Sequence, residues 1–257
     1  MLTAKNITYQ IGQKKLLNNI SLNFQVGKIN IIIGPNGAGK SSLIKLLSGQ
    51  IRPNTGEILY NQQNIKKSSF ADLAKYRAVL SQKIELAFPL NVSEVVMMGR
   101  YPHFHSVPTL SDKNICREAM QYFDILNFAD RNYTTLSGGE KQRVHFARIA
   151  SQIWKDDPYN TRYLFLDEPL TFLDIYYQFD FMDRLLEFTK NKNIVVVGVV
   201  HDLHLAAKYA DFMVLLNDGE ILASGTKLEV LTKGNIFKAF QLEPDILINN
   251  DKIVLHF

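Results

Sequence analysis

Eight consecutive residues near the N-terminus combine glycines, a lysine and a hydroxyl group at a spacing that suits phosphate binding. They read Gly34-Pro35-Asn36-Gly37-Ala38-Gly39-Lys40-Ser41 and fit the pattern G-x-x-x-x-G-K-[ST] at every fixed position. In such a loop the backbone N–H groups point at one anion, the lysine reaches the β- and γ-phosphates, and the serine hydroxyl binds Mg²⁺. A glycine turn without a ligand is the alternative. The strand-like run before the loop (29–33) and the helical spacing after it (42–47) favour a nucleotide site.

A pair of carboxylates follows an apolar run in the second half of the chain. Asp167 and Glu168 come directly after residues 163–166, which read as a buried strand. Because a parallel α/β sheet binds ligands at the ends of its strands, Asp167 suits Mg²⁺, directly or through water, and Glu168 could orient or deprotonate an attacking water. A solvated turn or a helix cap is the alternative, which Pro169 would suit. The four apolar residues before the pair favour a functional role.

Two further features could bind anions. His201 follows the apolar run 194–200 and is either a core or capping histidine or a partner of the γ-phosphate, and position alone does not decide between them. Ser137-Gly138-Gly139 opens a helical pattern, with Ser137 as N-cap and Glu140 completing a capping box. A hydroxyl, two glycine N–H groups and a helix N-terminus make a second anion site. Since one ATP already has its phosphate loop, this second site raises the question whether it binds the γ-phosphate of a nucleotide held by another subunit.

The expected elements place these residues in an α/β core. Residues 2–9 and 15–26 alternate as an antiparallel hairpin or meander, and the later apolar runs alternate with helical patterns. Alternating buried strands and helices indicate a mostly parallel sheet covered on both faces. Two prolines keep 100–108 irregular. The other strands are expected at 29–33, 77–81, 163–166, 193–200, 212–216, 220–223, 246–248 and 253–255, and the helices at 42–47, 70–76, 93–99, 112–128, 137–154, 175–190, 227–231 and 235–240.

The length of 257 residues predicts one large domain or a domain with a lobe, and the helical patterns in the middle of the chain favour a lobe inserted into the core. We expect an α/β nucleotide-binding core at about 1–85 and 160–257, an antiparallel β subdomain at its N-terminus, and a helical lobe at about 86–159. The loop 82–90 carries apolar residues that we expect to be exposed, which indicates a docking site.

The composition fits a soluble protein of a reducing compartment. Net charge is +4 with no lysine or arginine block, so a nucleic-acid partner is not expected. The lone Cys116 cannot form an internal disulfide. The first six residues lack the apolar core of a signal peptide, and the longest apolar run, 194–200, is too short to cross a bilayer. Any work at a membrane would therefore pass through a partner.

Taken together, these motifs resemble the ATP-binding cassette (ABC) ATPases over essentially the whole chain. The segment Leu136-Ser137-Gly138-Gly139-Glu140 is far more specific to that family than the phosphate loop alone. The resemblance implies a P-loop NTPase core with an inserted signature lobe, and ATP and Mg²⁺ as cofactors. It also implies a head-to-tail homodimer, in which each ATP lies between Lys40 of one copy and Ser137 of the other.

The resemblance also implies roles for individual residues. Spacing alone favours an ordinary strand tyrosine at Tyr9, whereas the family places an adenine-stacking residue there. Gln82, Glu168 and His201 correspond to the coupling-loop glutamine, the catalytic carboxylate and the switch histidine, and residues 171–174 to the inter-subunit loop. The implied metal set is Ser41, Gln82 and Asp167. The implied nucleotide contacts are Tyr9, Gly34, Pro35, Asn36, Gly37, Ala38, Gly39, Lys40, Ser41, Ser42, Ser137, Gly138, Gly139 and Asp174.

A finer resemblance points to a subgroup. Residues 86–103 are similar to the ATPases of iron-chelate, haem and cobalamin importers, and the polar insertion after Trp154 is similar to the haemin-import subunits. This implies a peripheral protein of the cytoplasmic face of the inner membrane that hydrolyses ATP to energise haemin uptake. Its partners would be a second copy, integral membrane permease subunits and, indirectly, a periplasmic haem-binding protein. The alternatives are a ferric siderophore or cobalamin importer, or a soluble ABC ATPase without a transport role.

Two positions depart from the family pattern. Leu170 stands where threonine is usual, and Phe172 replaces a small residue. Both lie beside the expected dimer contact, which puts the rate of hydrolysis in question more than its existence. His103, His105 and His204 also invite a direct haem role. That role is disfavoured because in this family the cargo passes through separate membrane subunits.

Overall fold

The central element of the fold is a six-stranded sheet. The computed structural model describes residues 1–81, 86, 88–155, 160–171, 173–190, 192–249 and 252–257. Five neighbouring strands of the sheet pair in parallel, and β10 joins the edge antiparallel to β9. β3, β7 and β8 consist wholly of buried residues, as expected for a parallel sheet covered on both faces. The spatial order is β10 (Glu220–Gly225), β9 (Phe212–Asn217), β3 (Ile29–Ile33), β8 (Ile194–Val199), β7 (Arg162–Asp167) and β6 (Arg77–Leu80).

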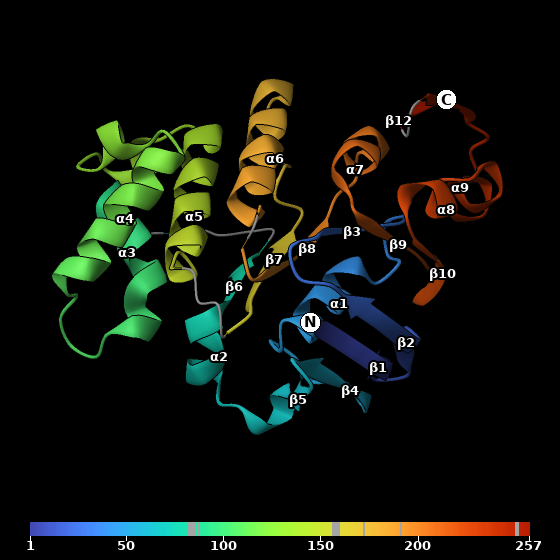
Figure 1. Cartoon of the computed structure of the whole chain (residues 1–257), viewed down its shortest axis with the longest axis horizontal. Coiled ribbons are helices and arrows are strands. Elements are labelled where there is room, and N and C mark those ends of the chain that lie inside the picture. The colour runs from blue at the N-terminus through green and yellow to red at the C-terminus, as the bar shows by residue number, and fades with distance from the viewer. Residues whose placement is uncertain (82–85, 87, 156–159, 172, 191, 250–251) are drawn as a thin grey trace.

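An antiparallel sheet built from the N-terminal part of the chain packs beside the central one (Figure 1). Its strands follow the order β2 (Lys14–Phe24), β1 (Leu2–Ile11), β4 (Thr55–Tyr60) and β5 (Gln63–Asn64). The C-terminus forms a separate hairpin of β11 (Asp245–Asn249) and β12 (Lys252–His256). The expected fold class is thus confirmed: a mostly parallel sheet, an antiparallel N-terminal sheet and covering helices.

The buried apolar residues form two clusters, one on each face of the central sheet. Successive side chains of a strand point to opposite faces, so neighbours in β3 join different clusters. Ile31 and Ile33 pack toward the side of α5 (Gly138–Gln152), α6 (Ile175–Thr189) and α7 (Leu203–Tyr209), whereas Ile32 packs with Leu43 and with Leu17 of β2. Helix α1 (Lys40–Leu47) therefore fills the space between the two sheets, where its N-terminus is fixed relative to both.

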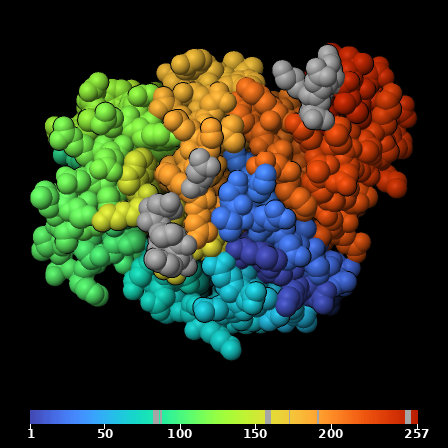
Figure 2. Space-filling view, viewed as in Figure 1, coloured from blue at the N-terminus to red at the C-terminus, as the bar shows by residue number. Residues whose placement is uncertain are grey.

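The helices between β6 and β7 gather into a lobe at one side of the molecule, opposite the C-terminal segment (Figures 1 and 2). They are α3 (Val92–Met97), α4 (Leu110–Tyr122) and α5 (Gly138–Gln152), with 3₁₀ turns at Met98–His103, Leu126–Phe128 and Tyr133–Thr135. The remaining helices are α2 (Phe70–Tyr76), α6 (Ile175–Thr189), α7 (Leu203–Tyr209), α8 (Lys227–Val230) and α9 (Lys233–Phe240), with a 3₁₀ turn at Ile65–Lys67. Within the described ranges no helix is both long and apolar enough to span a bilayer.

Two expectations from the sequence need adjustment. Residues 100–108 were expected to be irregular, but the first part of this segment lies in the 3₁₀ turn Met98–His103, which contains Pro102. Proline fixes φ near the helical value, so it fits a short turn in which its missing N–H is not needed. In the loop 82–90, Phe88 is exposed as expected, whereas Leu86 and Leu90 pack partly against the core. Residues 82–85 and 87 lie outside the described part of the chain.

Candidate nucleotide-binding site

The phosphate loop follows β3 directly, and its glycines are required by the conformation. Gly34, Gly37 and Gly39 have φ of 148°, 84° and 98°, a region that residues with a Cβ rarely adopt. A Cβ at Gly34 would lie 2.2 Å from Leu216 O, and one at Gly39 would lie 2.7 Å from Leu16 O. Gly39 is also the N-cap of α1, so no side chain caps the first N–H groups of that helix. The loop and the helix N-terminus thus present backbone donors to an anion.

Lys40 is held inside this loop by the loop's own carbonyls. Its Nζ donates to Gly34 O at 2.8 Å and to Pro35 O at 2.9 Å, and the residue is buried. Burial lowers the pKa of Lys40, while the nearby carboxylates Glu168 and Asp167 raise it. A phosphate bound in the loop would replace these contacts to neutral carbonyls with contacts between opposite charges, which are stronger.

Three strands end level with one another at the loop's edge of the sheet. Ile32 of β3 and Asp167 of β7 are both register partners of Val199 of β8. The residues that follow these strands, from Gly34, Glu168 and Val200 onward, therefore emerge side by side. Strand register is a property of the folded sheet, and it brings together residues more than 100 positions apart.

Ser41 and Asp167 meet at this edge. Ser41 Oγ donates to Asp167 Oδ1 at 2.9 Å. Burial raises the pKa of Asp167, whereas the Ser41 hydrogen bond lowers it. A hydroxyl beside a carboxylate is a donor set that Mg²⁺ accepts, because this ion prefers oxygen ligands and binds through one or two protein groups plus phosphates and water. Among the described residues no cluster of three or more His, Cys, Asp or Glu could hold a metal alone, so an ion here would need ligands from the nucleotide and from water.

Glu168 and His201 form a half-exposed pair. Glu168 Oε1 lies 2.7 Å from His201 Nε2, and the two side chains are 14% and 44% exposed. Glu168 has φ of +53°, a left-handed conformation that is uncommon for a residue other than glycine. The pair borders a cavity of about 240 Å³ whose lining includes Leu170, Thr171 and Leu205. Glu168 also lies close enough to Lys40 to raise the pKa of that lysine, so this carboxylate can hold a water molecule at a phosphate bound to Lys40.

The departure at position 170 has a structural explanation. Leu170 is buried and joins the apolar cluster under α5 and α6, so an apolar side chain is satisfied there. A hydroxyl is supplied by the next residue instead, since Thr171 Oγ1 donates to Glu168 O at 3.1 Å. The other departure, Phe172, and the predicted site residue Gln82 lie outside the described residues.

Tyr9 lies close to the phosphate loop. It is the register partner of Leu17, and Leu17 Cδ2 is 2.8 Å from the position that a Cβ of Gly39 would take. The ring is partly buried against the apolar cluster between the two sheets. Its position is compatible with both interpretations drawn from the sequence, the strand tyrosine and the adenine-stacking residue.

The segment Ser137-Gly138-Gly139 lies in the helical lobe, away from α1 (Figure 1). The predicted capping box is confirmed: Ser137 N donates to Glu140 Oε2 at 2.8 Å, and Glu140 N donates to Ser137 Oγ at 3.3 Å. Gly138 is exposed, and a Cβ added there would meet nothing within 4 Å. Asp174 caps α6 in a similar way, because its Oδ1 accepts from Tyr177 N at 3.1 Å. The structure thus does not bring the second anion site to the phosphate loop within one chain.

Two glutamines that sequence reasoning did not assign to the site hold the loop after Glu168. Gln142 Nε2 donates to Pro169 O at 2.6 Å, and Gln178 Nε2 donates to Leu173 O at 3.0 Å. Neither contact has a local sequence signal, because the partners are carbonyls of a loop that the glutamines reach only in the folded chain. The sequence shows only that Gln142 lies about one turn into the helix that begins after Ser137.

Comparisons with known proteins agree with this geometry. A family model described as "ABC transporter" matches residues 17–171. Two relatives named "Hemin import ATP-binding protein HmuV" are 40% identical: one from Escherichia coli O157:H7 over 91% of this chain and 89% of its own length, and one from Pseudoalteromonas translucida over 100% and 98%. A metal-chelate type ABC transporter solved in an inward-facing conformation aligns with a TM-score of 0.82 and 25% identity over 99% of this chain and 95% of its own. On these grounds the chain belongs to the ABC transporter family.

Proposed function

We propose that this chain is the ATP-hydrolysing subunit of an importer that takes haemin across the inner membrane of a bacterium. The observation that carries the proposal is the convergence of Lys40, Asp167, Glu168 and His201 at one edge of the sheet, in a chain that matches hemin-import relatives over nearly its whole length. The alternative cargoes, a ferric siderophore or cobalamin, would use the same ATPase chemistry.

The site residues divide the work of ATP hydrolysis. Backbone N–H groups of residues 34–41 and the N-terminus of α1 bind the phosphates, together with the side chain of Ser42, and Lys40 moves from its carbonyl partners to the β- and γ-phosphates. Ser41 and Asp167, with Gln82, would hold Mg²⁺, which supplies charge neutralisation of the phosphates when bound. Glu168 orients the attacking water and accepts its proton. His201 hydrogen-bonds the γ-phosphate, and Tyr9 stacks on the adenine.

A second copy of the chain completes the site. Gly138 is exposed and Gly139 is half-buried at the start of α5, so their N–H groups and the Ser137 hydroxyl lie in the helical lobe and not at the phosphate loop of their own subunit. In a head-to-tail pair they would cap the γ-phosphate bound by the partner, with Asp174 and its neighbours at the contact. ATP then stabilises the closed pair because it contacts both copies, and hydrolysis removes that contact.

The closing and opening of the two copies would act on the membrane partner through the helical lobe. Phe88 is 71% exposed, and Tyr101, Val107 and Leu110 are also exposed on this lobe. We infer that this apolar surface and the loop 82–89 bind integral permease subunits, which places the chain at the cytoplasmic face of the inner membrane as a peripheral protein. A periplasmic haem-binding protein would act on the permease and reach this chain indirectly. His103 Nε2 lies 2.8 Å from Gln152 O, so this ring is held by a main-chain contact within the lobe.

The test is ATPase activity of the chain reconstituted with its permease in vesicles. We expect stimulation when the lumen holds binding protein loaded with haemin, and none with the same protein loaded with ferric siderophore or left empty. Stimulation by the siderophore form alone would reassign the cargo. A chain that does not co-purify with any integral membrane protein and hydrolyses ATP at its full rate alone would instead favour an ATPase without a transport role.

A further inference from the structure

The loop that follows Glu168 is held by side-chain amides from two helices. Gln142 of α5 donates to Pro169 O at 2.6 Å, and Gln178 of α6 donates to Leu173 O at 3.0 Å and to Leu170 O at 3.4 Å. Each bond satisfies a main-chain carbonyl in a segment that is neither helix nor strand. Such bonds fix the path of a loop because a buried carbonyl without a partner is costly.

The backbone that these bonds hold is strained at one residue. Glu168 has φ of +53° and precedes a proline, which restricts its conformation further. A residue in this region keeps its conformation only when the surrounding structure determines it. Pro169 O belongs to the peptide between Pro169 and Leu170, so the bond from Gln142 fixes the backbone one peptide beyond the Glu168–Pro169 bond and limits how Glu168 can turn.

Gln142 also belongs to the helix that begins at the second anion site. Ser137 caps α5, and Gln142 lies about one turn further along the same helix. Gly139 faces the same loop, since a Cβ added there would lie 3.8 Å from Leu173 Cδ2. A helix turn is stiff, so a displacement at Ser137 is carried to the amide of Gln142 and from there to Pro169.

We propose that Gln142 is a positioning residue that couples the Ser137-Gly138-Gly139 segment to the Glu168 carboxylate of the same chain. The inference rests on the proposed pairing of two copies. In that pair Ser137 touches the ATP of the partner, whereas Glu168 acts on the ATP of its own subunit. Gln142 therefore links the two ATP sites: engagement of α5 at one site sets the orientation of the carboxylate at the other.

The decisive variant is Gln142→Met, which keeps the length and unbranched shape of the side chain and removes its donor. The matched control is Gln152→Met on the same helix. Gln152 Nε2 donates to Ala74 O at 2.7 Å and to Arg77 O at 2.9 Å, so the control loses two amide-to-carbonyl bonds that lie away from the Glu168 loop. We expect Gln142→Met to lower kcat by about tenfold with a KM for ATP within twofold of wild type, because a misplaced catalytic group slows chemistry without weakening binding. The control should keep kcat within twofold.

A second measurement separates positioning from assembly. In the Glu168→Gln background, ATP should produce as much dimer with Gln142→Met as without it. The proposal is overturned if kcat of Gln142→Met stays within twofold of the control, or if the dimer is lost in parallel with kcat. A parent Glu168→Gln protein that remains monomeric with ATP would overturn the pairing itself. If Gln142→Met does not fold, Gln178→Met removes the other donor to this loop and is judged by the same kcat, KM and dimer criteria.

Discussion

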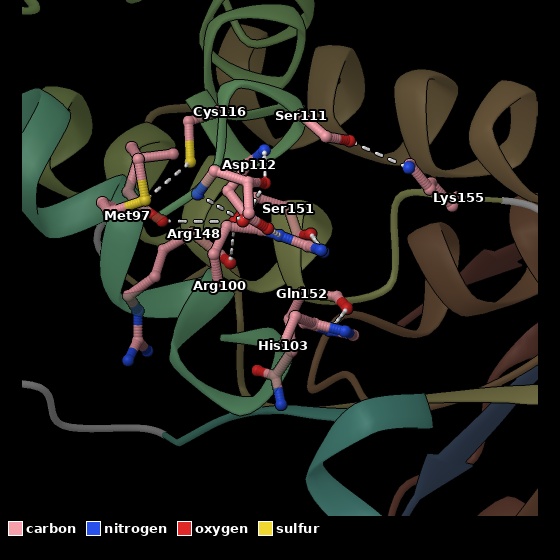
Figure 3. Close-up of polar contacts among 12 residues, drawn as sticks. Met97, Arg100, His103, Ser111, Asp112, Cys116, Arg148, Ser151, Gln152 and Lys155 are labelled. Atoms are coloured by element: carbon pink, nitrogen blue, oxygen red, sulfur yellow. Dashed lines mark hydrogen bonds and ion pairs between the residues drawn. The ribbon is translucent and has the colours of Figure 1, made fainter. Parts of the chain in front are cut away.

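Two pairs of ionisable side chains in this chain differ in burial and in setting. Arg100 Nε lies 3.0 Å from Asp112 Oδ1 in the helical lobe, with side chains 7% and 5% exposed (Figure 3). The Glu168–His201 pair at the edge of the central sheet is more exposed and borders a cavity. Both pairs have short contacts, so distance alone does not separate a structural pair from one placed for chemistry.

The surroundings of the two pairs make the difference. Arg100 also donates to Ser151 O at 2.7 Å, and Asp112 accepts from Thr109 N at 2.9 Å and from Thr109 Oγ1 at 2.6 Å. Burial would raise the pKa of Asp112, but the bonds from Thr109 and Arg100 together hold it below its ordinary value. This pair is saturated with partners and supports the fold. Glu168 instead combines a strained backbone with access to a cavity, which leaves its side chain able to engage a ligand.

The largest effect is expected from Glu168→Gln. Loss of the carboxylate removes the base, so kcat should fall about a thousandfold while ATP affinity is retained. ATP should also trap a dimer, visible by size-exclusion chromatography, and phosphate release gives the rate. Turnover close to that of wild type would show that Glu168 takes no part in hydrolysis. The Glu168–His201 pair would then not differ in role from the Arg100–Asp112 pair.

Arg100→Met should act on stability instead of turnover. It leaves the Asp112 carboxylate buried without its cation, which costs about 3–5 kcal/mol of unfolding free energy. The double variant Arg100→Met with Asp112→Asn removes the stranded charge and should recover part of that loss. Urea unfolding gives the unfolding free energy of both variants. A single variant within about 1 kcal/mol of wild type would show that the lobe does not depend on this pair.

The helical lobe should also make stability depend on pH. Burial lowers the pKa of His145 to about 3, and its Nε2 lies 2.8 Å from Tyr133 Oη. In the unfolded chain this histidine binds a proton near pH 6.5. Below that pH the unfolded state therefore holds more protons, and unfolding free energy should fall by about 2 kcal/mol between pH 6.5 and 5. His145→Phe should make the unfolding free energy depend less on pH, as measured by urea unfolding at each pH. If the pH dependence is unchanged in this variant, other groups cause it.

The smallest effect is expected from Thr171→Val. It removes the bond from Thr171 Oγ1 to Glu168 O, which lies on the exposed side of the loop. Turnover should fall about threefold and stability by less than about 1 kcal/mol, as for one solvent-accessible hydrogen bond. Steady-state kinetics measure the change in turnover, and thermal unfolding measures the change in stability. A loss as large as that of Glu168→Gln would mean that this bond, more than the histidine, holds the carboxylate.

Many helices and strands can be predicted from local sequence patterns. The helix expected at 175–190 is observed at Ile175–Thr189, the strand expected at 163–166 at Arg162–Asp167, and the terminal hairpin within two residues of its expected limits. Periodicity, glycine spacing and capping residues depend on near neighbours in the chain, so a single sequence contains them. The phosphate loop and the capping box at Ser137 belong to this class.

Other features depended on the tertiary structure. The bond from Ser41 to Asp167 joins residues 126 positions apart, and the bond from Gln142 to Pro169 depends on how α5 packs beside the end of β7. The strand order and the saturated Arg100–Asp112 pair are of the same kind. The sequence by itself determined which residues could bind a nucleotide, because that information lies in spacing and residue type. Which of them meet was decided only by the register of the parallel strands and the packing of the helical lobe, since contacts between distant segments are made by the whole core and leave no local pattern.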